Sequence, residues 1–321
     1  MGLQQPGIVQ FYVLRLKFRW NELKNPQRLK RRKGMRVGIA DDFDLNRIAE
    51  SGQCFRWKPI DRDAYRIIFR QNVLSIRKIS ETYYDVDCTP EVWSRIWQNY
   101  FDLSESYGSI RAMICRETDP FLYRAAQHEK GIRILCQDPW EMMVTSILTQ
   151  NRNIPMIQRS IELLCAVAGN RLPGTETMYA FPEPEALLAC NEEALRQCKL
   201  GYRWKYIHAL AQDVVEKRIN LNAFPALSDE QLHHELMKIY GAGPKVVNCM
   251  MLFAFHRLNA FPVDVWIQRV LQQWYPEGYP FESYTPYNGV MQQYMFAYIK
   301  HISETHGEEQ IMRSEPAEGE K

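Results

Sequence analysis

The sequence lacks the features that mark membrane proteins, metal-cluster proteins and repeat proteins. It has no run of about 18 apolar residues, so we expect no membrane-spanning helix. Its eight cysteines form neither a C-x-x-C pair nor a cysteine–histidine cluster at zinc spacing, so we expect no metal ligands. The N-terminus lacks the basic region and cleavage site of a signal peptide, and no internal repeat is found. Scattered, reduced thiols then favour a cytoplasmic location.

A net charge is nearly absent as well. The chain carries 40 Lys and Arg against 38 Asp and Glu, a formal net charge of +2. Residues 1–34 hold nine of the basic residues and a single acidic one, Glu22. Removing them from the totals leaves 31 basic and 37 acidic residues, a net charge of −6. If this protein binds nucleic acid, the attraction to phosphate must come from local arrangements of groups, because the net charge does not supply it.

The two chain ends differ from the rest in composition. The basic stretch "LKNPQRLKRRKG" within residues 1–34 is typical of a nucleic-acid arm. An over-long start is the alternative, because the patterned chain begins at Met35 with "MRVGIADDFDL". Both interpretations remain open. The polar tail, residues 307–321, predicts disorder.

Hydrophobic patterning divides the remainder into two domains and predicts an α+β fold. Residues 35–130 are predicted to form a β-rich domain of strands with a few helices, because "AYRIIFR", "VLSIRKIS" and "TYYDVD" are short, rich in β-branched and aromatic residues, and largely alternating. Gln71-Asn72 is the expected turn between the first two. Residues 131–306 follow a helical pattern with clear caps, such as Asp138 before Pro139 and Ser228 before acidic residues.

One stretch, "IYGAGPKVVNCM" from Ile239 to Met250, breaks a helix and restarts it at once. Gly241 and Gly243 permit a tight hairpin, and Pro244 begins the second helix. Free N–H groups at the start of that helix are typical of a phosphate-binding site. A glycine-rich link between two core helices is the alternative interpretation.

Lys245 and Asp264 are the candidate reactive pair. Lys245 lies in the first helical turn, where the dipole disfavours a cation, and an unprotonated amine is a nucleophile. Asp264 starts the next helix in "FPVDVWIQRVL", 19 positions later. An ordinary carboxylate at a helix start is the alternative for Asp264 alone. Together the two indicate an amine nucleophile with a carboxylate that stabilises developing positive charge.

With "GAGPK" followed by "PVD", the chain resembles the helix-hairpin-helix DNA glycosylase superfamily. Three more segments in order, "SGQCFRW", "CQDPWEMMVTSILTQNRNI" and "LGYRWKYI", resemble the 8-oxoguanine DNA glycosylases. The resemblance spans about residues 43–302. It implies an antiparallel β-rich N-terminal domain packed on an all-α helix-hairpin-helix glycosylase domain, with double-stranded DNA between them and the damaged base flipped out.

The resemblance also implies residue roles. The amine of Lys245 would attack C1′ and form a Schiff base that permits strand nicking by β-elimination, while Asp264 stabilises the charge. The carbonyl of Gly52 would accept the N7–H that 8-oxoguanine has and guanine lacks. The base pocket would also include Cys249, Gln292 and Phe296, and the DNA contacts Asn151, Tyr202, Arg203, Gly241 and Gly243. From pattern alone, these residues are equally explained as turn glycines, core side chains, a surface amide and a pair at a helix start.

Two departures from the family pattern concern DNA contacts. Met156 stands where eukaryotic members carry an arginine to the opposite cytosine, and Trp266 stands where they carry a histidine near the lesion phosphate. The first puts opposite-base selectivity in doubt, and the second weakens one phosphate contact. No cysteine follows Cys249, so the iron–sulfur cluster of other superfamily members is not expected.

Three functions remain open at this stage. The favoured one is a monomeric, bifunctional 8-oxoguanine glycosylase/lyase that acts at the nucleoid without a cofactor, with room for a structural cation at the hairpin. The second is a monofunctional alkylated-base glycosylase, which Lys245 disfavours. The third is a non-catalytic helix-hairpin-helix DNA-binding protein, which needs neither Lys245 nor Asp264.

Overall fold

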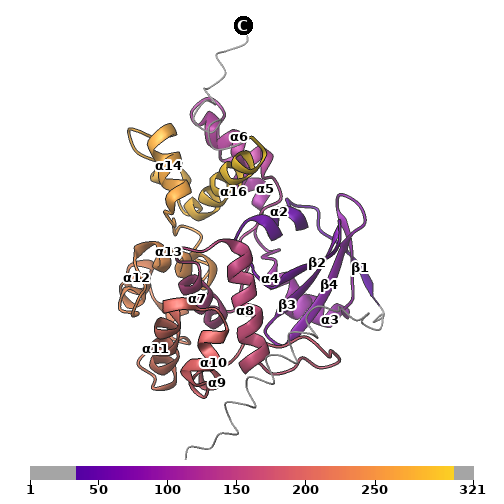
Figure 1. Cartoon of the computed structure of the whole chain (residues 1–321). Coiled ribbons are helices and arrows are strands. Elements are labelled where there is room, and N and C mark those ends of the chain that lie inside the picture. The colour runs from indigo at the N-terminus through magenta and orange to yellow at the C-terminus, as the bar shows by residue number, and fades with distance from the viewer. Residues whose placement is uncertain (1–33, 307–321) are drawn as a thin grey trace, which may run out of the picture.

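The computed structural model describes residues 34–306, which form a five-stranded sheet followed by a long series of helices (Figure 1). The predictions of a basic N-terminal extension and a disordered tail lie outside the described residues. In Figure 1 the sheet and the later helices occupy opposite sides of the molecule. The predicted fold class, an antiparallel β-rich unit followed by a helical unit, is confirmed.

The sheet is antiparallel throughout, with strand order β1-β5-β4-β3-β2. Ile67 pairs with Leu74 across β3 and β4, and both are fully buried, which fixes the register. Phe69 pairs with Asn72, so the turn is one residue earlier than predicted. The strands are β1 (Met35–Gly38), β2 (Trp57–Asp61), β3 (Ala64–Phe69), β4 (Asn72–Lys78) and β5 (Tyr83–Val86).

The stretch after β5 is helical, which is more helix than the few helices predicted among the strands up to residue 130. Thr89 caps the first of these helices and Pro90 occupies its first position, so the local signals favour helix. Trp93 and Trp97 are buried against the sheet. The helices of the N-terminal part are α2 (Leu45–Glu50), α3 (Pro90–Val92), η1 (Trp93–Trp97), α4 (Gln98–Tyr100), α5 (Tyr107–Ala112) and α6 (Pro120–His128).

The remaining helices carry most of the predicted caps. Asp138 accepts a hydrogen bond from the Glu141 N–H, and Gly169 ends the following long helix. Such a cap contributes about 1 kcal/mol to stability. The helices are α7 (Pro139–Leu148), α8 (Ile154–Ala168), α9 (Pro184–Leu188), α10 (Glu192–Gln197), η2 (Gly201–Arg203), α11 (Trp204–Val215), η3 (Phe224–Ala226), α12 (Asp229–Met237), α13 (Pro244–Phe253), α14 (Val265–Trp274), α15 (Phe281–Tyr284) and α16 (Asn288–His306).

Two large hydrophobic clusters form the core, one under the sheet and one among the helices. Two chain segments cross between them. Phe55, which precedes β2, packs in the helical cluster, and Leu135, which precedes α7, packs in the sheet cluster. Gln53 ties these segments together: its amide donates to the Arg133 carbonyl at 2.8 Å and accepts from the Leu135 N–H at 2.8 Å. The domain limits at residues 130 and 131 remain a prediction.

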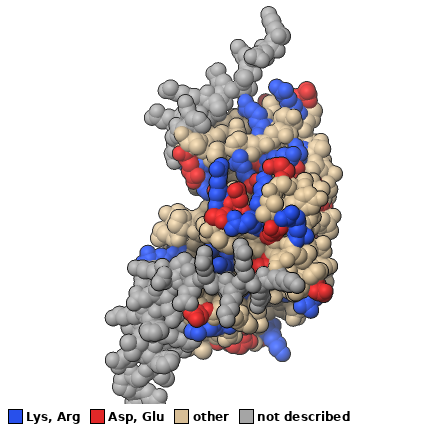
Figure 2. Space-filling view, turned by 90° about the vertical axis from the view of Figure 1, so that its right-hand side faces the viewer, with Lys and Arg blue, Asp and Glu red and all other residues tan. Residues whose placement is uncertain are grey.

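The surface carries both charge signs in close mixture. Figure 2 shows Lys and Arg side chains beside Asp and Glu side chains on the face that it draws. Exposed ion pairs such as Arg36–Asp85 at 2.9 Å contribute to this pattern. Among residues 34–306, none of the helices combines the length and the apolar composition needed to span a bilayer.

Candidate active site

The helix-hairpin-helix is formed by α12, residues 238–243 and α13. Ser228 starts α12 with a complete capping box. Gly241 has φ +84°, and a Cβ on it would lie 2.5 Å from the Tyr206 ring, so only glycine fits. Gly243 precedes α13 without any side-chain cap, which leaves the first N–H groups of the helix free. The hairpin therefore presents an uncapped, electropositive helix end to solvent.

Lys245 lies in the first turn of α13 and is half-buried. Its Nζ donates to Thr149 Oγ1, at the end of α7, at 3.3 Å. The Thr149 hydroxyl itself donates to the Ser146 carbonyl at 2.7 Å, so its oxygen faces the amine as an acceptor. Cys249 follows one turn after Lys245. Burial raises the pKa of the Cys249 thiol, although the positive charge of Lys245 opposes this shift.

Asp264 is the N-cap of α14. Its Oδ1 accepts from the N–H groups of Trp266 at 3.0 Å and Ile267 at 2.9 Å. Both bonds end on Oδ1, so Oδ2 takes no part in the cap. Asp264 can therefore be both a helix cap and a charge-stabilising carboxylate. Oδ1 caps α14, and Oδ2 is available to carry negative charge in the pocket that Asp264 lines.

A single pocket brings together the six residues predicted for catalysis and base binding. It has an empty volume of about 480 Å³, including the part open to solvent, which is in the ordinary range for a small-molecule site. From these predictions it is lined by Gly52, Lys245, Cys249, Asp264, Gln292 and Phe296.

The floor of this pocket is shaped by contacts between α16 and the earlier chain. A Cβ on Gly52 would lie 3.1 Å from Phe296 Cε1, and Gly52 has φ +79°. No donor within residues 34–306 reaches the carbonyl oxygen of Gly52, which is left as a free acceptor. The buried Gln292 donates to the Pro262 carbonyl at 3.1 Å, two residues before Asp264. The amide is thereby held in a fixed orientation.

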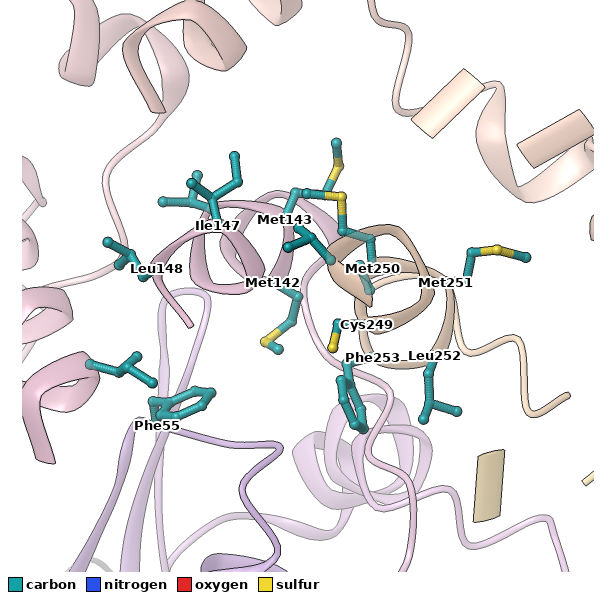
Figure 3. Packing of buried hydrophobic residues seen from close by; sticks show 14 of the residues in the cluster. Phe55, Met142, Met143, Ile147, Leu148, Cys249, Met250, Met251, Leu252 and Phe253 are labelled. Carbon is teal, nitrogen blue, oxygen red and sulfur yellow. The ribbon is translucent and has the colours of Figure 1, made fainter. Parts of the chain in front are cut away.

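Figure 3 shows the apolar wall of the site. The Met142 side chain from α7 and Cys249 from α13 point toward the same space, with Phe253 beside Cys249. Phe55 completes this wall from the N-terminal part of the chain. Flat apolar and sulfur-bearing surfaces of this kind suit an aromatic ring.

Several lining residues escaped the sequence analysis, notably Thr149, Ser146 and Gln53. Thr145, Ser146 and Thr149 are small polar residues in an otherwise apolar helix, which was a visible signal of a polar face. Gln53 gave no comparable signal, because three of its partners, Arg133, Leu135 and Gln137, lie about 80 residues away in sequence. The other pocket residues not predicted are Ser51, Phe55, Met142, Phe253, Pro262 and Gln293.

The predicted DNA contacts lie outside this pocket and differ in exposure. Asn151 is exposed with φ +48°, Tyr202 is 49% exposed, and Met156, in the first turn of α8, is 50% exposed. Arg203 is only 5% exposed: it donates to the Gln150 carbonyl and lies over the Tyr202 ring, with Cζ 4.4 Å from its centroid.

Trp266, in the first turn of α14, is half-buried, and the guanidinium of Arg269 lies 5.1 Å from its ring centroid. The structure thus places an aromatic ring and a cation together at the position where the resemblance predicts a phosphate contact.

Comparison with known families agrees with this architecture. Residues 36–143 match the family described as 8-oxoguanine DNA glycosylase, N-terminal domain. Residues 144–279 match the HhH-GPD superfamily base excision DNA repair protein. The fold and the site therefore define a helix-hairpin-helix base excision DNA repair protein.

Individual relatives narrow the class. The 8-oxoguanine glycosylase/lyase of Clostridium acetobutylicum, solved with double-stranded DNA containing cytosine opposite 8-oxoguanine, is 32% identical, with a TM-score of 0.76 over 83% of this chain and 98% of that chain. A structure titled MBOgg1 in complex with a low-affinity DNA ligand is 33% identical, with a TM-score of 0.78 over 87% and 98%. A probable N-glycosylase/DNA lyase of Methanothermobacter thermautotrophicus is 26% identical over 75% of this chain and 85% of its own length. The chain belongs to the 8-oxoguanine DNA glycosylase family.

Proposed function

We propose that this protein is a bifunctional DNA glycosylase/lyase that removes 8-oxoguanine from double-stranded DNA and can nick the strand. The observation that carries the proposal is the meeting of Lys245, Asp264 and Gly52 on one pocket beside the hairpin. Phosphate binding alone requires only the free helix N-terminus. A nucleophile, a carboxylate and a base-discriminating acceptor in one pocket indicate chemistry on a flipped base.

Discrimination between damaged and normal guanine rests on Gly52. Its free carbonyl oxygen accepts a hydrogen bond, and 8-oxoguanine offers an N7–H where guanine has only a lone pair. Guanine would place two acceptors against each other and leave a buried polar group unpaired, which costs about 1–3 kcal/mol. Phe296 and Cys249 flank the base, and Gln292 bonds its edge.

The chemical step uses the amine of Lys245. The amine forms a bond to C1′ while the C1′–N9 bond breaks, and the departing base takes up a proton. Opening of the sugar ring gives a Schiff base between Lys245 and C1′. Loss of a proton from C2′ then breaks the C3′–O bond and nicks the strand. The hydrogen bond to Thr149 orients the amine at the start of this sequence.

Asp264 stabilises the positive charge that develops on the sugar. Its Oδ1 is held by two backbone N–H groups, which fixes the direction of Oδ2 without help from the substrate. Pre-organised charge of this kind is worth about 10²–10³ in rate.

The surrounding residues hold the DNA. The uncapped start of α13, shaped by Gly241 and Gly243, binds a backbone phosphate, and Trp266 adds a stacking surface. Asn151, Tyr202 and Arg203 occupy the space that the flipped base leaves. With Met156 beside the orphaned base, discrimination for cytosine is reduced.

The proposal needs no cofactor, because the protein itself supplies the nucleophile. We propose a monomer that acts on chromosomal DNA in the cytoplasm, in keeping with the absence of disulfide bonds among residues 34–306. A structural cation at the hairpin carbonyls also belongs to this proposal. Such an ion takes oxygen ligands. The Gly241 carbonyl already accepts a hydrogen bond from Gln150 at 3.1 Å, so fewer hairpin carbonyl oxygens are left to bind the ion.

Three duplexes test the proposal: one with a single 8-oxoguanine opposite cytosine, one with 7-methylguanine at that position, and one undamaged. We expect release of 8-oxoguanine with strand nicking, and intact strands for the other two. Release of 7-methylguanine alone would establish the monofunctional alternative. Tight binding with no base released from any duplex would establish the non-catalytic one.

A further inference from the structure

A second cluster of reactive side chains lies outside the base pocket, formed by Asp102, Cys136 and His256. One carboxylate oxygen, the sulfur and one imidazole nitrogen all lie within 4.8 Å of one another. The three residues come from separate parts of the chain: Asp102 follows α4, Cys136 precedes α7, and His256 follows α13. Asp102 is buried and the other two are half-buried, so the cluster is partly shielded but reachable from solvent.

The donor set and its spacing fit a zinc-type cation. Zinc binds thiolate, imidazole and carboxylate at about 2.0–2.3 Å in a tetrahedron, which places neighbouring donors about 3.3–3.8 Å apart. His256 Nε2 already lies 3.1 Å from Asp102 Oδ2. The widest separation, at most 4.8 Å, requires an adjustment of about 1 Å by half-buried side chains. Three protein ligands leave the fourth position to water.

The imidazole of His256 is the strongest sign of a ligand at this place. Both ring nitrogens are buried, and neither has a partner with hydrogen-bond geometry among residues 34–306. Nε2 approaches Asp102 as a charge contact without meeting that geometry. Buried polar atoms in folded proteins are nearly always hydrogen-bonded, so a ring that has one charge contact and no well-formed hydrogen bond on either nitrogen calls for an explanation. A metal ion between the ring, the carboxylate and the thiol would satisfy one of them directly.

Neighbouring groups hold the carboxylate in place. The Tyr107 hydroxyl donates to Asp102 Oδ2 at 2.8 Å, and the Arg133 guanidinium donates to the Asp102 carbonyl at 2.6 Å. Partners that orient a metal-binding carboxylate in this way are typical of real sites.

The backbone beside the other two donors is fixed as well. The Cys136 N–H donates to the Tyr100 carbonyl at 2.9 Å, and the Arg257 N–H, next to His256, donates to the Met251 carbonyl at 2.9 Å. The backbone that carries these donors is therefore held in place, and only the side chains have to adjust.

We propose that Asp102, Cys136 and His256 form a binding site for one divalent transition metal ion of the zinc type. The ion joins the segment that carries the sheet cluster to the end of α13, the helix that begins with Lys245. The site requires neither the lesion chemistry nor DNA, so it stands or falls independently of the proposed function.

Cobalt(II) is the probe, because a cobalt–thiolate bond gives a near-ultraviolet charge-transfer band and tetrahedral cobalt absorbs in the visible. The metal-free, full-length protein is titrated with cobalt and then with zinc. We expect one cobalt ion per chain, a thiolate band that zinc abolishes, and a higher Tm in zinc. Cys136→Ser should lose the band, and His256→Asn should weaken binding at least tenfold. Asn is chosen because it tolerates the positive φ of 53° at this position.

Cys115→Ser is the matched control, because Cys115 is exposed and stands outside the cluster. It should bind cobalt as the wild type does. The absence of a thiolate band in the wild type would overturn the proposal and leave His256–Asp102 as an ion pair only. A band that persists unchanged in Cys136→Ser would overturn it as well, since another thiol would then be the ligand. All variants are first compared by circular dichroism, which separates misfolding from ligand loss.

Discussion

Gly52 faces the ring of Phe296 so closely that a Cβ on Gly52 would lie 3.1 Å from Cε1. The two residues are 244 positions apart in sequence, on the segment after α2 and on α16. Both residues line the base pocket. Because Gly52 also has φ +79°, both its space and its backbone conformation favour glycine.

Gly52→Ala should therefore reduce excision of 8-oxoguanine by more than its effect on stability explains. The positive φ costs about 1–2 kcal/mol, and the new methyl narrows the pocket. Gly278→Ala is the control: Gly278 also has positive φ, 107°, but a Cβ there meets nothing within 4 Å. Single-turnover excision rates and thermal melting of both variants separate the loss of activity from the loss of stability. Equal losses of activity in the two variants would contradict the assigned place of Gly52.

The hairpin glycines offer a second matched pair. Gly241→Ala drives a Cβ to 2.5–2.7 Å from the Tyr206 ring atoms, so we expect a loss of more than about 2 kcal/mol in the free energy of unfolding. Gly243→Ala meets nothing within 4 Å and should cost about 1 kcal/mol or less. The methyl occupies open space at the start of α13, where we propose that a phosphate binds, so duplex affinity should fall while the fold is kept. Wild-type duplex affinity in Gly243→Ala would contradict the binding of a phosphate at the start of α13.

Asp264 allows its two roles to be separated. Asp264→Asn keeps an oxygen that caps α14 but removes the charge, so we expect unchanged melting and a rate lower by about 10²–10³. Asp264→Ala should show the same rate loss and a further cost of about 0.5–2 kcal/mol from the missing cap. Excision at saturating enzyme and denaturant unfolding measure the two quantities. An Asn variant with the wild-type rate would reduce Asp264 to a structural cap.

Short-range signals account for what the sequence predicted well. The caps at Asp138 and Ser228, the hairpin at Gly241 and the helix start at Asp264 are each encoded within a few residues. Contacts between distant segments carry no such local pattern. Nothing near Lys245 indicates Thr149, its partner 96 positions earlier.

The same reasoning explains the errors in the N-terminal part. Strands β1 and β2 were not predicted, because short strands owe their stability to the neighbours with which they pair. The stretch after residue 89 is helical, although it carries the same aromatic residues that favour strands. In this stretch, burial of the aromatic side chains against the sheet favours helix over strand, and burial cannot be predicted from composition.

Met156 leads to a prediction about the opposite base. A thioether donates no hydrogen bond, whereas an arginine fork would reach the free acceptors of an orphaned cytosine. One bidentate base contact is worth about 1–3 kcal/mol, so its absence predicts a loss of roughly 5- to 150-fold in preference for cytosine over adenine. Met156 is half-exposed, so Met156→Arg should restore that preference without loss of stability. Excision from four duplexes that differ only in the opposite base measures it. A cytosine preference above about a thousandfold in the wild type would contradict the prediction.

Borohydride trapping tests the central claim, that Lys245 is the nucleophile, most directly. Borohydride reduces a Schiff base to a stable amine, so incubation with an 8-oxoguanine duplex should yield a covalent enzyme–DNA complex. The control Lys58→Gln alters an exposed lysine of strand β2, outside the hairpin, that pairs with Glu162 at 2.6 Å, and it should trap like the wild type. Lys245→Gln should give no trapped complex and no released base. A Lys245→Gln protein that still trapped DNA, or still released 8-oxoguanine at the wild-type rate, would contradict the account.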